Sequence, residues 1–498
     1  MTMRLSTGIE GLDAVLHGGL LPGQIYMVRG QPGAGKTTLA MQFLMAGALR
    51  GESVLLVTLS ESERELRSSA AAHGWDLEGV QILDIHPEDE GAIPDQQYTI
   101  FHPSDVELAP VTRRITEEVE RLQPSRVAFD SLTEVRLLSR DALRYRRQVL
   151  ALKAFLLAQG VTTLFLGESA RPELDVEIAS IVHGVISLSL SKGTHSMARR
   201  SVEVEKCRGS DFQSGIHPLR IVRGGLEVYP GLRAEEHARA FPRDRLSSGI
   251  AELDQMLGGG LDRGTCTLLS GHAGVGKTTL GVQFLRQAAR RGERSVLYSF
   301  DEGPAEIVHR CDGITTPIGE SLERGLLRIE KVNPIHLYPD EFASWIRVEV
   351  ERRGTRLVMI DSLNGYRQSM PDERYLVTHM HQLSSYLNRM GVTTLLINEV
   401  SNLTGDFAAS QFGMSYLTDA ILLLKYFEFE GALHKAIGTL KKRLGDHEKV
   451  LREFRITPQG IRVGAPLPQL HGILQGEPRF GGSVTGLLPL AECGGLSG

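Results

Sequence analysis

Short apolar runs alternate with longer amphipathic stretches along most of the chain. The first part contains five such runs, rich in branched aliphatic residues, at positions 24–30, 53–60, 80–85, 126–131 and 162–168. Runs of this length with few polar positions predict strands that are buried on both faces, as in a parallel sheet. Between them, apolar residues recur with a helical period, most clearly over 111–122 and 140–160. This alternation predicts an α/β fold, a mainly parallel sheet flanked by helices.

The pattern then changes and starts again. After Gly184, three strand-like runs follow one another closely, at 184–191, 201–207 and 217–223. The second part repeats the order, with runs at 265–271, 295–302, 326–332, 356–362, 393–399, 420–428 and 435–443. The pattern therefore predicts two successive copies of one architecture.

The sequence itself carries the same duplication. The 40 residues from Leu5 and the 40 residues from Leu246 are identical at 21 positions with a constant offset of 241, and GVTTLFLGE from Gly160 returns as GVTTLLINE from Gly391. An internal repeat explains this agreement, and chance does not. We expect a first domain over 1–232, a polar linker over 233–245, a second domain over 246–480 and a flexible, Gly-rich tail over 481–498.

Composition narrows the class of protein. The length of 498 residues fits two domains or more, and an apolar fraction of 41% with a charged fraction of 23% is that of a soluble globular protein. The net charge of -5 argues against nucleic-acid binding. The N-terminus has no signal-like apolar stretch and no run approaches a membrane span, so we expect a cytoplasmic protein. The cysteines form no C-x-x-C pair, which predicts reduced thiols at Cys207, Cys266, Cys311 and Cys493.

Two segments match the phosphate-binding pattern G-x-x-x-x-G-K-[ST], namely GQPGAGKT from Gly30 and GHAGVGKT from Gly271. Each follows a predicted strand and opens a predicted helix, which is the context that this motif requires. Glycines let backbone N–H groups close around phosphate oxygens, and Lys36 and Lys277 are expected to reach the β- and γ-phosphates. The residues expected to bind ATP here are Gly33, Ala34, Gly35, Lys36, Thr37, Thr38, Gly274, Val275, Gly276, Lys277, Thr278 and Thr279.

A P-loop also needs an acidic strand end that helps to hold the metal ion. VAFDS ends an apolar run at Asp130, and VMIDS does so at Asp361. A lone Asp at a strand end can also be a helix cap, but the upstream P-loops favour a role at Mg²⁺. We expect the metal to be held by Thr37 and Asp130 in the first domain, and by Thr278, Asp361 and Asp301 in the second.

Hydrolysis needs a base that orients water, and the second strand of each copy ends in acids. TLSES carries Glu61, and SFDEG carries Asp301 and Glu302. The first copy has Ser60 where the second has Asp301, so the first site has one carboxylate fewer. These three acids are the candidate catalytic residues, and solvated surface charge is the alternative interpretation.

Both copies also carry a pair of basic residues near their C-terminal ends. Lys206 and Arg208 follow the pattern K-x-R in one copy, and Lys441 and Arg443 follow it in the other. On a strand this spacing points both side chains to one face. Such a face suits the γ-phosphate of ATP bound by a neighbouring subunit, and a solvated basic face is the alternative.

Together these motifs resemble the KaiC family of bacterial circadian-clock ATPases and autokinases, over about residues 3–480. The resemblance implies two tandem RecA-like P-loop NTPase domains. The family has a Glu-Glu pair at the strand tip and a trans-acting K-x-R-G motif. The segments that carry the likeness are SE at 60–61, DE at 301–302, KCRG at 206–209, KKRL at 441–444, HEKVLREFRITPQGI from 447 and LPQLHGILQGEP from 467.

The resemblance further implies a homohexamer of two stacked rings with ATP between subunits, acting in timing or signalling. The first ring would hydrolyse ATP slowly, and the second would phosphorylate its own residues. The family's adjacent serine and threonine acceptors align with Ser415 and Tyr416, so Ser415 is the expected phosphoacceptor and Thr418 a substitute. A KaiB-like protein would dock on the first ring. The tail does not present the peptide through which a KaiA-type activator would act, which argues against such dependence.

Two interpretations from other classes remain open. RecA-like rings also drive DNA motors and recombinases, although the acidic balance and the lack of a DNA-binding appendage argue against one here. A scaffold that binds ATP mainly to hold its subunits together is favoured by Ser60. DNA-stimulated ATP hydrolysis would identify the motor, and ATP binding without turnover would identify the scaffold.

Overall fold

The computed structural model describes residues 3–85, 104–139, 142–168, 178–192, 198–314, 317–370, 373–400, 416–429, 431–468, 470–472 and 479–480. The chain divides into two compact units, Met1–Gly231 and Leu232–Gly498. The stretch expected to be a linker packs on the second unit, because Ala234 lies in its core and the side chain of Arg389 donates to the carbonyl of His237 at 3.0 Å. The expected tail lies outside the described residues.

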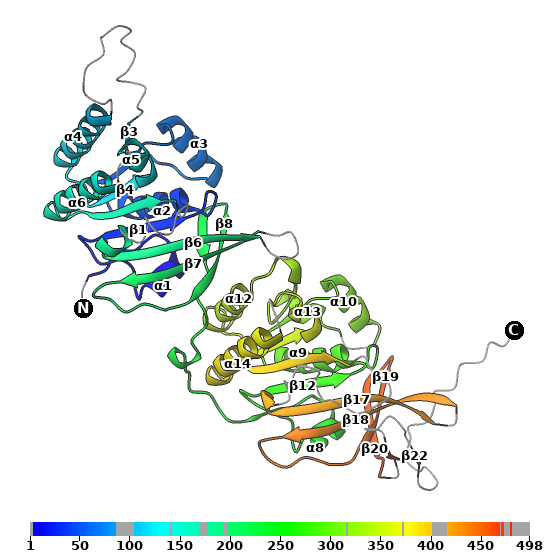
Figure 1. Cartoon of the computed structure of the whole chain (residues 1–498). Coiled ribbons are helices and arrows are strands. Elements are labelled where there is room, and N and C mark those ends of the chain that lie inside the picture. Colours follow the sequence, from blue (N-terminus) through cyan, green and yellow to red (C-terminus); the bar gives the residue numbers. More distant parts are fainter. Residues whose placement is uncertain are drawn as a thin grey trace. The chain divides into compact units, whose positions relative to one another are not determined.

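The first unit is built on one sheet with helices on both sides (Figure 1). Its strands run in the order β3-β2-β4-β5-β1-β6-β7-β8-β9. They are β1 (Ile25–Gly30), β2 (Val54–Thr58), β3 (Gln81–Asp84), β4 (Arg126–Asp130), β5 (Thr162–Gly167), β6 (Gly184–Lys192), β7 (Ala198–Cys207), β8 (Ile216–Val222) and β9 (Gly225–Val228). The helices are α1 (Glu10–Val15), α2 (Lys36–Ala48), α3 (Glu63–His73), α4 (Ser104–Leu122), α5 (Leu132–Ser139) and α6 (Ala142–Ala158).

The second unit repeats this sheet in the order β14-β13-β15-β16-β12-β17-β18-β19-β20. The strands are β12 (Cys266–Gly271), β13 (Ser295–Ser299), β14 (Leu327–Lys331), β15 (Leu357–Asp361), β16 (Thr393–Glu399), β17 (Ala420–Phe429), β18 (Ala432–Lys442), β19 (Arg452–Thr457) and β20 (Gly460–Pro466). The helices are α8 (Ala251–Met256), α9 (Lys277–Arg290), α10 (Pro304–Asp312), α11 (Gly319–Glu323), α12 (Pro339–Glu351), α13 (Leu363–Arg367) and α14 (Glu373–Arg389). Two short pairs, β10 (Arg245–Leu246) with β11 (Leu261–Asp262) and β21 (Leu470–His471) with β22 (Arg479–Phe480), lie apart from it.

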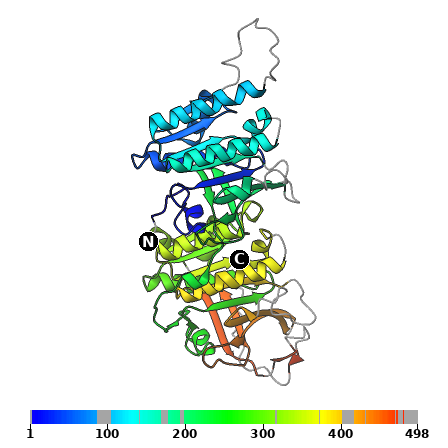
Figure 2. The ribbon, with the colours of Figure 1, turned by 60° about the vertical axis from the view of Figure 1, so that its left-hand side comes forward.

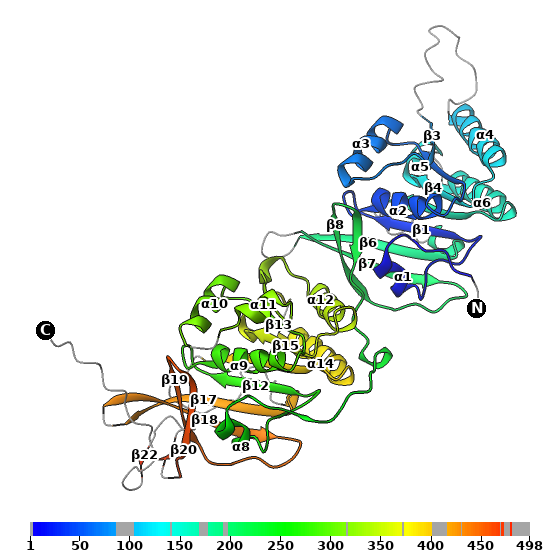
Figure 3. The ribbon, with the colours of Figure 1, turned by 180° about the vertical axis from the view of Figure 1, so that it is seen from behind.

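Each sheet is buried on both faces, as the apolar runs predict. Along β1, Ile25 and Met27 pack in the core under α4, α5 and α6, whereas Tyr26 and Val28 pack under α1, α2 and α3. The second unit pairs α8, α9 and α10 with one face and α12, α13 and α14 with the other. Figures 2 and 3 show these layers within each unit from two further sides. The expected fold class, two mainly parallel sheets with flanking helices, is confirmed.

The strand order determines where loops meet. In the first unit β5 lies between β1 and β4, and all three run parallel. In the second unit β16 lies between β12 and β15 in the same way. Because parallel strands end at the same edge, the residues that follow β1, β2, β4 and β5 gather at one edge of the sheet, and their repeats gather at the same edge of the second sheet.

Candidate nucleotide sites

Each P-loop connects a central strand to a helix at this edge. The last loop glycines, Gly35 and Gly276, both have a φ of +110°, which an L side chain rarely adopts. A Cβ on Gly276 would also lie 2.5 Å from the side chain of Ile456. The predicted phosphate-binding residues lie in these loops and in the first turns of α2 and α9: Gly33, Ala34, Gly35, Lys36, Thr37, Thr38, Gly274, Val275, Gly276, Lys277, Thr278 and Thr279.

In both units the P-loop threonine contacts the acid that ends a sheet strand. Thr37 Oγ1 donates to Asp130 Oδ2 at 2.7 Å, and Thr278 Oγ1 donates to Asp361 Oδ2 at 2.6 Å. Burial raises the pKa of Asp130 and raises the pKa of Asp361 to about 6. Oxygen donors of this kind suit Mg²⁺, and a divalent cation would favour the ionised carboxylates that burial disfavours. Both predicted threonine–aspartate pairs are therefore brought together in a form that fits a metal.

A glutamate that the sequence patterns did not single out lies near each P-loop lysine. Burial lowers the pKa of Lys36, and Glu168, just after β5, is the largest influence that opposes this shift. Burial likewise lowers the pKa of Lys277, and Glu399, at the end of β16, is the largest opposing influence. The Nζ atom of each lysine also donates to a carbonyl at its own P-loop, at 2.8 and 2.7 Å. The duplicated GVTTLFLGE and GVTTLLINE segments end in these glutamates, which was the available signal.

The tip of the second strand has the same turn in both units. Thr58 Oγ1 donates to the carbonyl of Glu61 at 2.8 Å, and Ser299 Oγ donates to the carbonyl of Glu302 at 2.7 Å. Burial raises the pKa of Glu61, and the nearby Asp130 adds to the rise. The candidate base of the first unit and its predicted metal ligand therefore lie within electrostatic reach of each other.

The two acids of the second tip differ in their partners. Ser362, the residue after the predicted metal ligand Asp361, donates its Oγ hydrogen to Asp301 Oδ2 at 3.1 Å. Glu302 Oε1 instead accepts from Arg310 Nη1 of α10 at 2.5 Å. Arg310 was not predicted from the sequence, and Ser69 occupies its position in the first unit at the offset of the repeat. Asp301 thus lies close to the predicted metal ligand Asp361, and Glu302 belongs to an ion pair.

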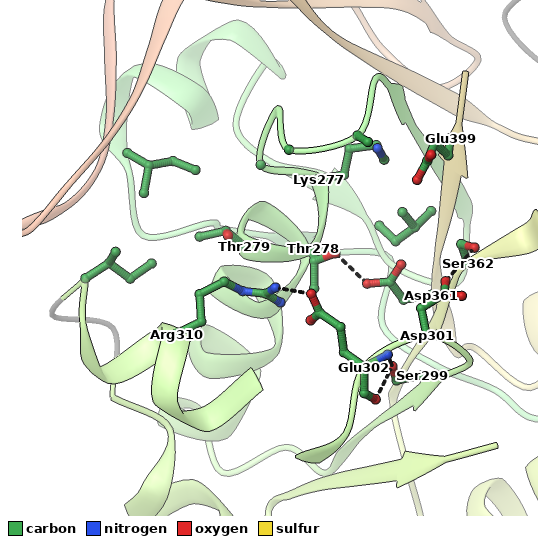
Figure 4. Close-up of a pocket in the computed structure, with 16 residues that line it drawn as sticks. Lys277, Thr278, Thr279, Ser299, Asp301, Glu302, Arg310, Asp361, Ser362 and Glu399 are labelled. Carbon is green, nitrogen blue, oxygen red and sulfur yellow. Dashed lines mark hydrogen bonds and ion pairs between the residues drawn. The ribbon is translucent and has the colours of Figure 1, made fainter. Parts of the chain in front are cut away.

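These groups surround a cavity of about 410 Å³ in the second unit, large enough for a small-molecule ligand. Figure 4 shows Lys277 and Glu399 on one side of it, Arg310 and Glu302 on another, and Thr278 with Asp361 between them. The Nε and Nη2 atoms of Arg310 are buried without a hydrogen-bond partner among the residues that the structure describes.

The predicted trans-acting cations do not join the P-loop of their own unit. Lys206 lies opposite Val185, which pairs with Met27, three residues before the P-loop begins at Gly30. Lys206 Nζ donates to the carbonyl of Val182 at 2.7 Å. Val182 comes just before β6, so it lies at the amino edge of the sheet, and the P-loop lies at the carboxyl edge. Arg208 donates to the carbonyl of Ser180 in the same segment, at 2.8 Å.

The second unit repeats this arrangement beside the expected phosphoacceptor. Lys441 Nζ donates to the carbonyl of Thr418 at 2.7 Å, and Arg443 Nη2 donates to that of Tyr416 at 2.5 Å. Ser415 lies outside the described residues. The side chain of the substitute acceptor Thr418 is fully buried, whereas Tyr416 is 55% exposed.

Another basic residue on the same strands does reach the P-loop of its own unit. Arg200 Nε donates to the carbonyl of Gly33 at 3.0 Å, and Lys435 Nζ donates to that of Gly274 at 3.2 Å. Lys206 lies six positions after Arg200, and Lys441 lies six positions after Lys435. Each antiparallel strand therefore carries one cation toward its own phosphate loop and another toward the opposite edge.

The chain matches the sequence model of one family, described as "ATPase: KaiC", over residues 5–233 and 246–467. It is 28% identical over 489 residues to the circadian clock oscillator protein KaiC of Acaryochloris marina, covering 95% of this chain and 91% of that one. The KaiC of Thermostichus vulcanus is 29% identical, with 95% and 92% covered. The circadian clock protein KaiC3 of a Synechocystis strain is 28% identical, with 96% and 95% covered. Within the described part of the chain, no helix has the length and apolar character needed to span a membrane.

Proposed function

The chain belongs to the KaiC family of ATPases, and from this premise we propose that it hydrolyses Mg-ATP at both P-loops and phosphorylates its own Ser415 at the second. Family membership makes it a double-domain ATP-binding ATPase. The observation that carries the finer proposal is the second site, where a P-loop, a threonine–aspartate pair and two further acids converge on one cavity. Timing or signalling is the proposed role, after the relatives named as clock proteins.

ATP binding rests on the two phosphate loops. Backbone N–H groups of each loop and the start of α2 or α9 would surround the phosphates, and Lys36 or Lys277 would neutralise their charge. Thr37 with Asp130, and Thr278 with Asp361, would hold Mg²⁺, which lowers the charge on the β- and γ-phosphates when bound. Glu168 and Glu399 would keep the neighbouring lysines protonated despite their burial.

For the second site we assign proton abstraction to Asp301. Its Oδ2 accepts from Ser362 Oγ at 3.1 Å, which fixes one oxygen on the metal side of the cavity. Glu302 is held by Arg310 and would have to leave that ion pair before it could accept a proton. Asp301 would take the proton of water during hydrolysis, or that of the Ser415 hydroxyl during transfer of the γ-phosphoryl group to its oxygen, with ADP leaving.

For the first site the base is Glu61, because Ser60 supplies no carboxylate. Burial, and after it Asp130, raises the pKa of Glu61, which makes its carboxylate a stronger base. A second candidate function follows from the same serine. The first unit would bind ATP mainly to hold subunits together, and measured turnover at this site decides between the two.

Phosphotransfer is proposed to run between subunits of a homohexamer. Lys441 and Arg443 bind the backbone of the 416–418 segment, next to Ser415, and lie away from their own P-loop. A neighbouring subunit's ATP would therefore meet the acceptor and both cations on one surface. Lys206 and Arg208 would serve the first ring in the same way, and a KaiB-like protein would dock there.

Phosphosite mapping by mass spectrometry after incubation with Mg-ATP tests the proposal. We expect phosphate on Ser415 in the unmodified chain and none in Lys277→Ala, because that variant lacks the second-site lysine. The matched control is Lys36→Ala, which should keep the label. Labelling of Ser415 in Lys277→Ala would refute the assignment of roles to the two units. ATP turnover without any phosphosite would leave a two-site ATPase.

A further inference from the structure

The second unit has a pocket at the edge of its sheet opposite the nucleotide site. It lies at the amino ends of β13 and β15, whereas the cavity with Lys277 lies at their carboxyl ends, about 15 Å away along five-residue strands. Its volume is about 440 Å³. The residues that line it include Arg263, Arg294, Arg353, Arg356, Glu293 and Phe241.

Two of the four arginines have carboxylate partners. Arg263 binds Asp244 at 2.5 Å and Glu293 at 2.7 Å, and it is largely buried. Arg353 lies 3.1 Å from Glu349. The other two arginines of the pocket are Arg294 and Arg356.

Arg294 and Arg356 have no ion pair with any residue that the structure describes. Arg294 Nη1 donates to the carbonyl of Arg353 at 2.8 Å, a neutral partner that leaves the guanidinium charge at the pocket lining uncompensated. Burial lowers the pKa of Arg356, the nearby Arg239 and Arg263 lower it further, and Glu293, which already pairs with Arg263, opposes the shift only in part. The pocket therefore concentrates positive charge that described acids do not balance.

The first unit offers an internal comparison for this charge. The backbone N–H of Arg356 donates to the carbonyl of Arg294 at 2.8 Å, and that of Ser125 donates to the carbonyl of Ser53 at 2.8 Å, so these pairs are equivalent. The side chain at each equivalent position also reaches one carbonyl, that of Arg353 or that of Leu122. In the order Arg263, Arg294, Arg353 and Arg356, the first unit has Pro22, Ser53, Leu122 and Ser125.

None of these first-unit residues is charged, although the backbone contacts are the same. If the arginines were needed to build this edge of the sheet, the first unit would need charged residues at the same positions. The arginines of the second unit therefore need another explanation. Guanidinium groups match phosphate oxygens in a planar, two-pronged geometry, which makes arginine the usual residue of phosphate sites. A volume of this size holds a small molecule.

We propose that this arginine pocket binds a small anion that carries two or more phosphate groups, separately from the ATP sites. Arg294 and Arg356 would supply the unpaired charge, with Arg353 at the rim and Arg263 fixed in place by its two acids. The ring of Phe241 closes one side of the pocket, where it packs against Gly264 and Gly391.

Equilibrium dialysis of labelled inorganic pyrophosphate against the full-length Lys36→Ala/Lys277→Ala protein tests this site with both P-loops weakened. We expect saturable binding with a Kd below about 1 mM. Arg294→Ala/Arg356→Ala should weaken it at least tenfold, because the pair loses two charge-assisted contacts to phosphate oxygens. Arg290→Ala/Arg324→Ala is the matched control, since both residues are exposed and lie outside both pockets, and it should bind as before.

Three results would overturn the proposal. They are the absence of saturable binding, an equal loss in the control pair, and tighter binding of a glutamate polymer through the same arginines, which would assign the pocket to an acidic protein segment. Arg294→Lys/Arg356→Lys tests the site if the alanine pair fails to fold, because lysine keeps the charge and most of the packing but cannot make the two-pronged contact. It should bind pyrophosphate severalfold more weakly than the arginine protein and more tightly than the alanine pair.

Discussion

Removing one carboxylate at a time from the end of β13, in the second unit, decides which acid activates the nucleophile. The change is Asp301→Asn or Glu302→Gln, each in a Lys36→Ala background so that the first site contributes little. Each substitution keeps the size of the side chain and removes its basicity. Both positions line the same cavity, but only Asp301 accepts a hydrogen bond from Ser362, the residue after the predicted metal ligand Asp361.

The expected losses follow from the contacts. A positioned general base contributes about 10²- to 10⁴-fold, so Asp301→Asn should lower kcat by that factor, or about 3–5 kcal/mol of barrier. Glu302 is 41% exposed and Arg310 is 35% exposed, so their ion pair is worth about 1 kcal/mol at most. Glu302→Gln should therefore change kcat by no more than about fivefold.

Phosphate release at saturating Mg-ATP measures kcat for each variant, and nucleotide binding measured separately confirms an intact site. Arg310→Ala is the control, because it frees Glu302 without removing a carboxylate and should also stay within about fivefold of the parent. A larger loss in Glu302→Gln than in Asp301→Asn would refute the reasoning. It would mean that the base is the acid now seen in the ion pair with Arg310.

Three further outcomes are expected. Ser60→Asp in a Lys277→Ala background should raise first-site phosphate release at least tenfold, because it adds the carboxylate that only the second site has; an unchanged rate would contradict this. Mixing inactive Arg443→Ala with inactive Lys277→Ala should restore part of the Ser415 label if cations act between subunits, whereas cations acting within one chain would give no recovery. Burial raises the pKa of Asp340 to about 6, so the folded state takes up a proton before the unfolded one as pH falls from 7 to 5. This uptake stabilises the parent by about 1 kcal/mol between pH 7 and pH 5, and Asp340→Asn should lack that gain. Urea unfolding at the two pH values, followed by Trp345 fluorescence in protein lacking the other tryptophan, measures the difference.

The repeated framework could be predicted because its signals are local. Apolar runs and P-loop glycines each lie within a few residues of the element that they specify, and both sheets follow from them. The pairing of Thr37 with Asp130, 93 positions apart, was predictable as well, because strands that run parallel end at one edge. Family resemblance added the proposed acceptor, Ser415, which lies outside the described residues.

Contacts that depend on strand order or helix orientation could not be predicted in the same way. Glu399 approaches Lys277 because β16 lies between β12 and β15, an order that no single segment encodes. Arg310 lies in the last turn of α10, and its contact with Glu302 depends on how that helix is oriented relative to the end of β13. Arg126 begins an apolar run and yet is fully buried, since Glu52 and two carbonyls take up its donors.

Comparison of the two units separates what the fold requires from what each site does. The sheet order and the backbone contacts at its amino edge are shared, including the 2.8 Å bond made by Ser125 in one unit and by Arg356 in the other. Residues at the two edges of the sheet have diverged, since the second unit has one more acid at the carboxyl edge and four arginines at the amino edge. Divergence confined to side chains on a shared backbone is a difference of chemistry and not of folding. The added acid and the four arginines at these edges are therefore the differences that the predictions above test.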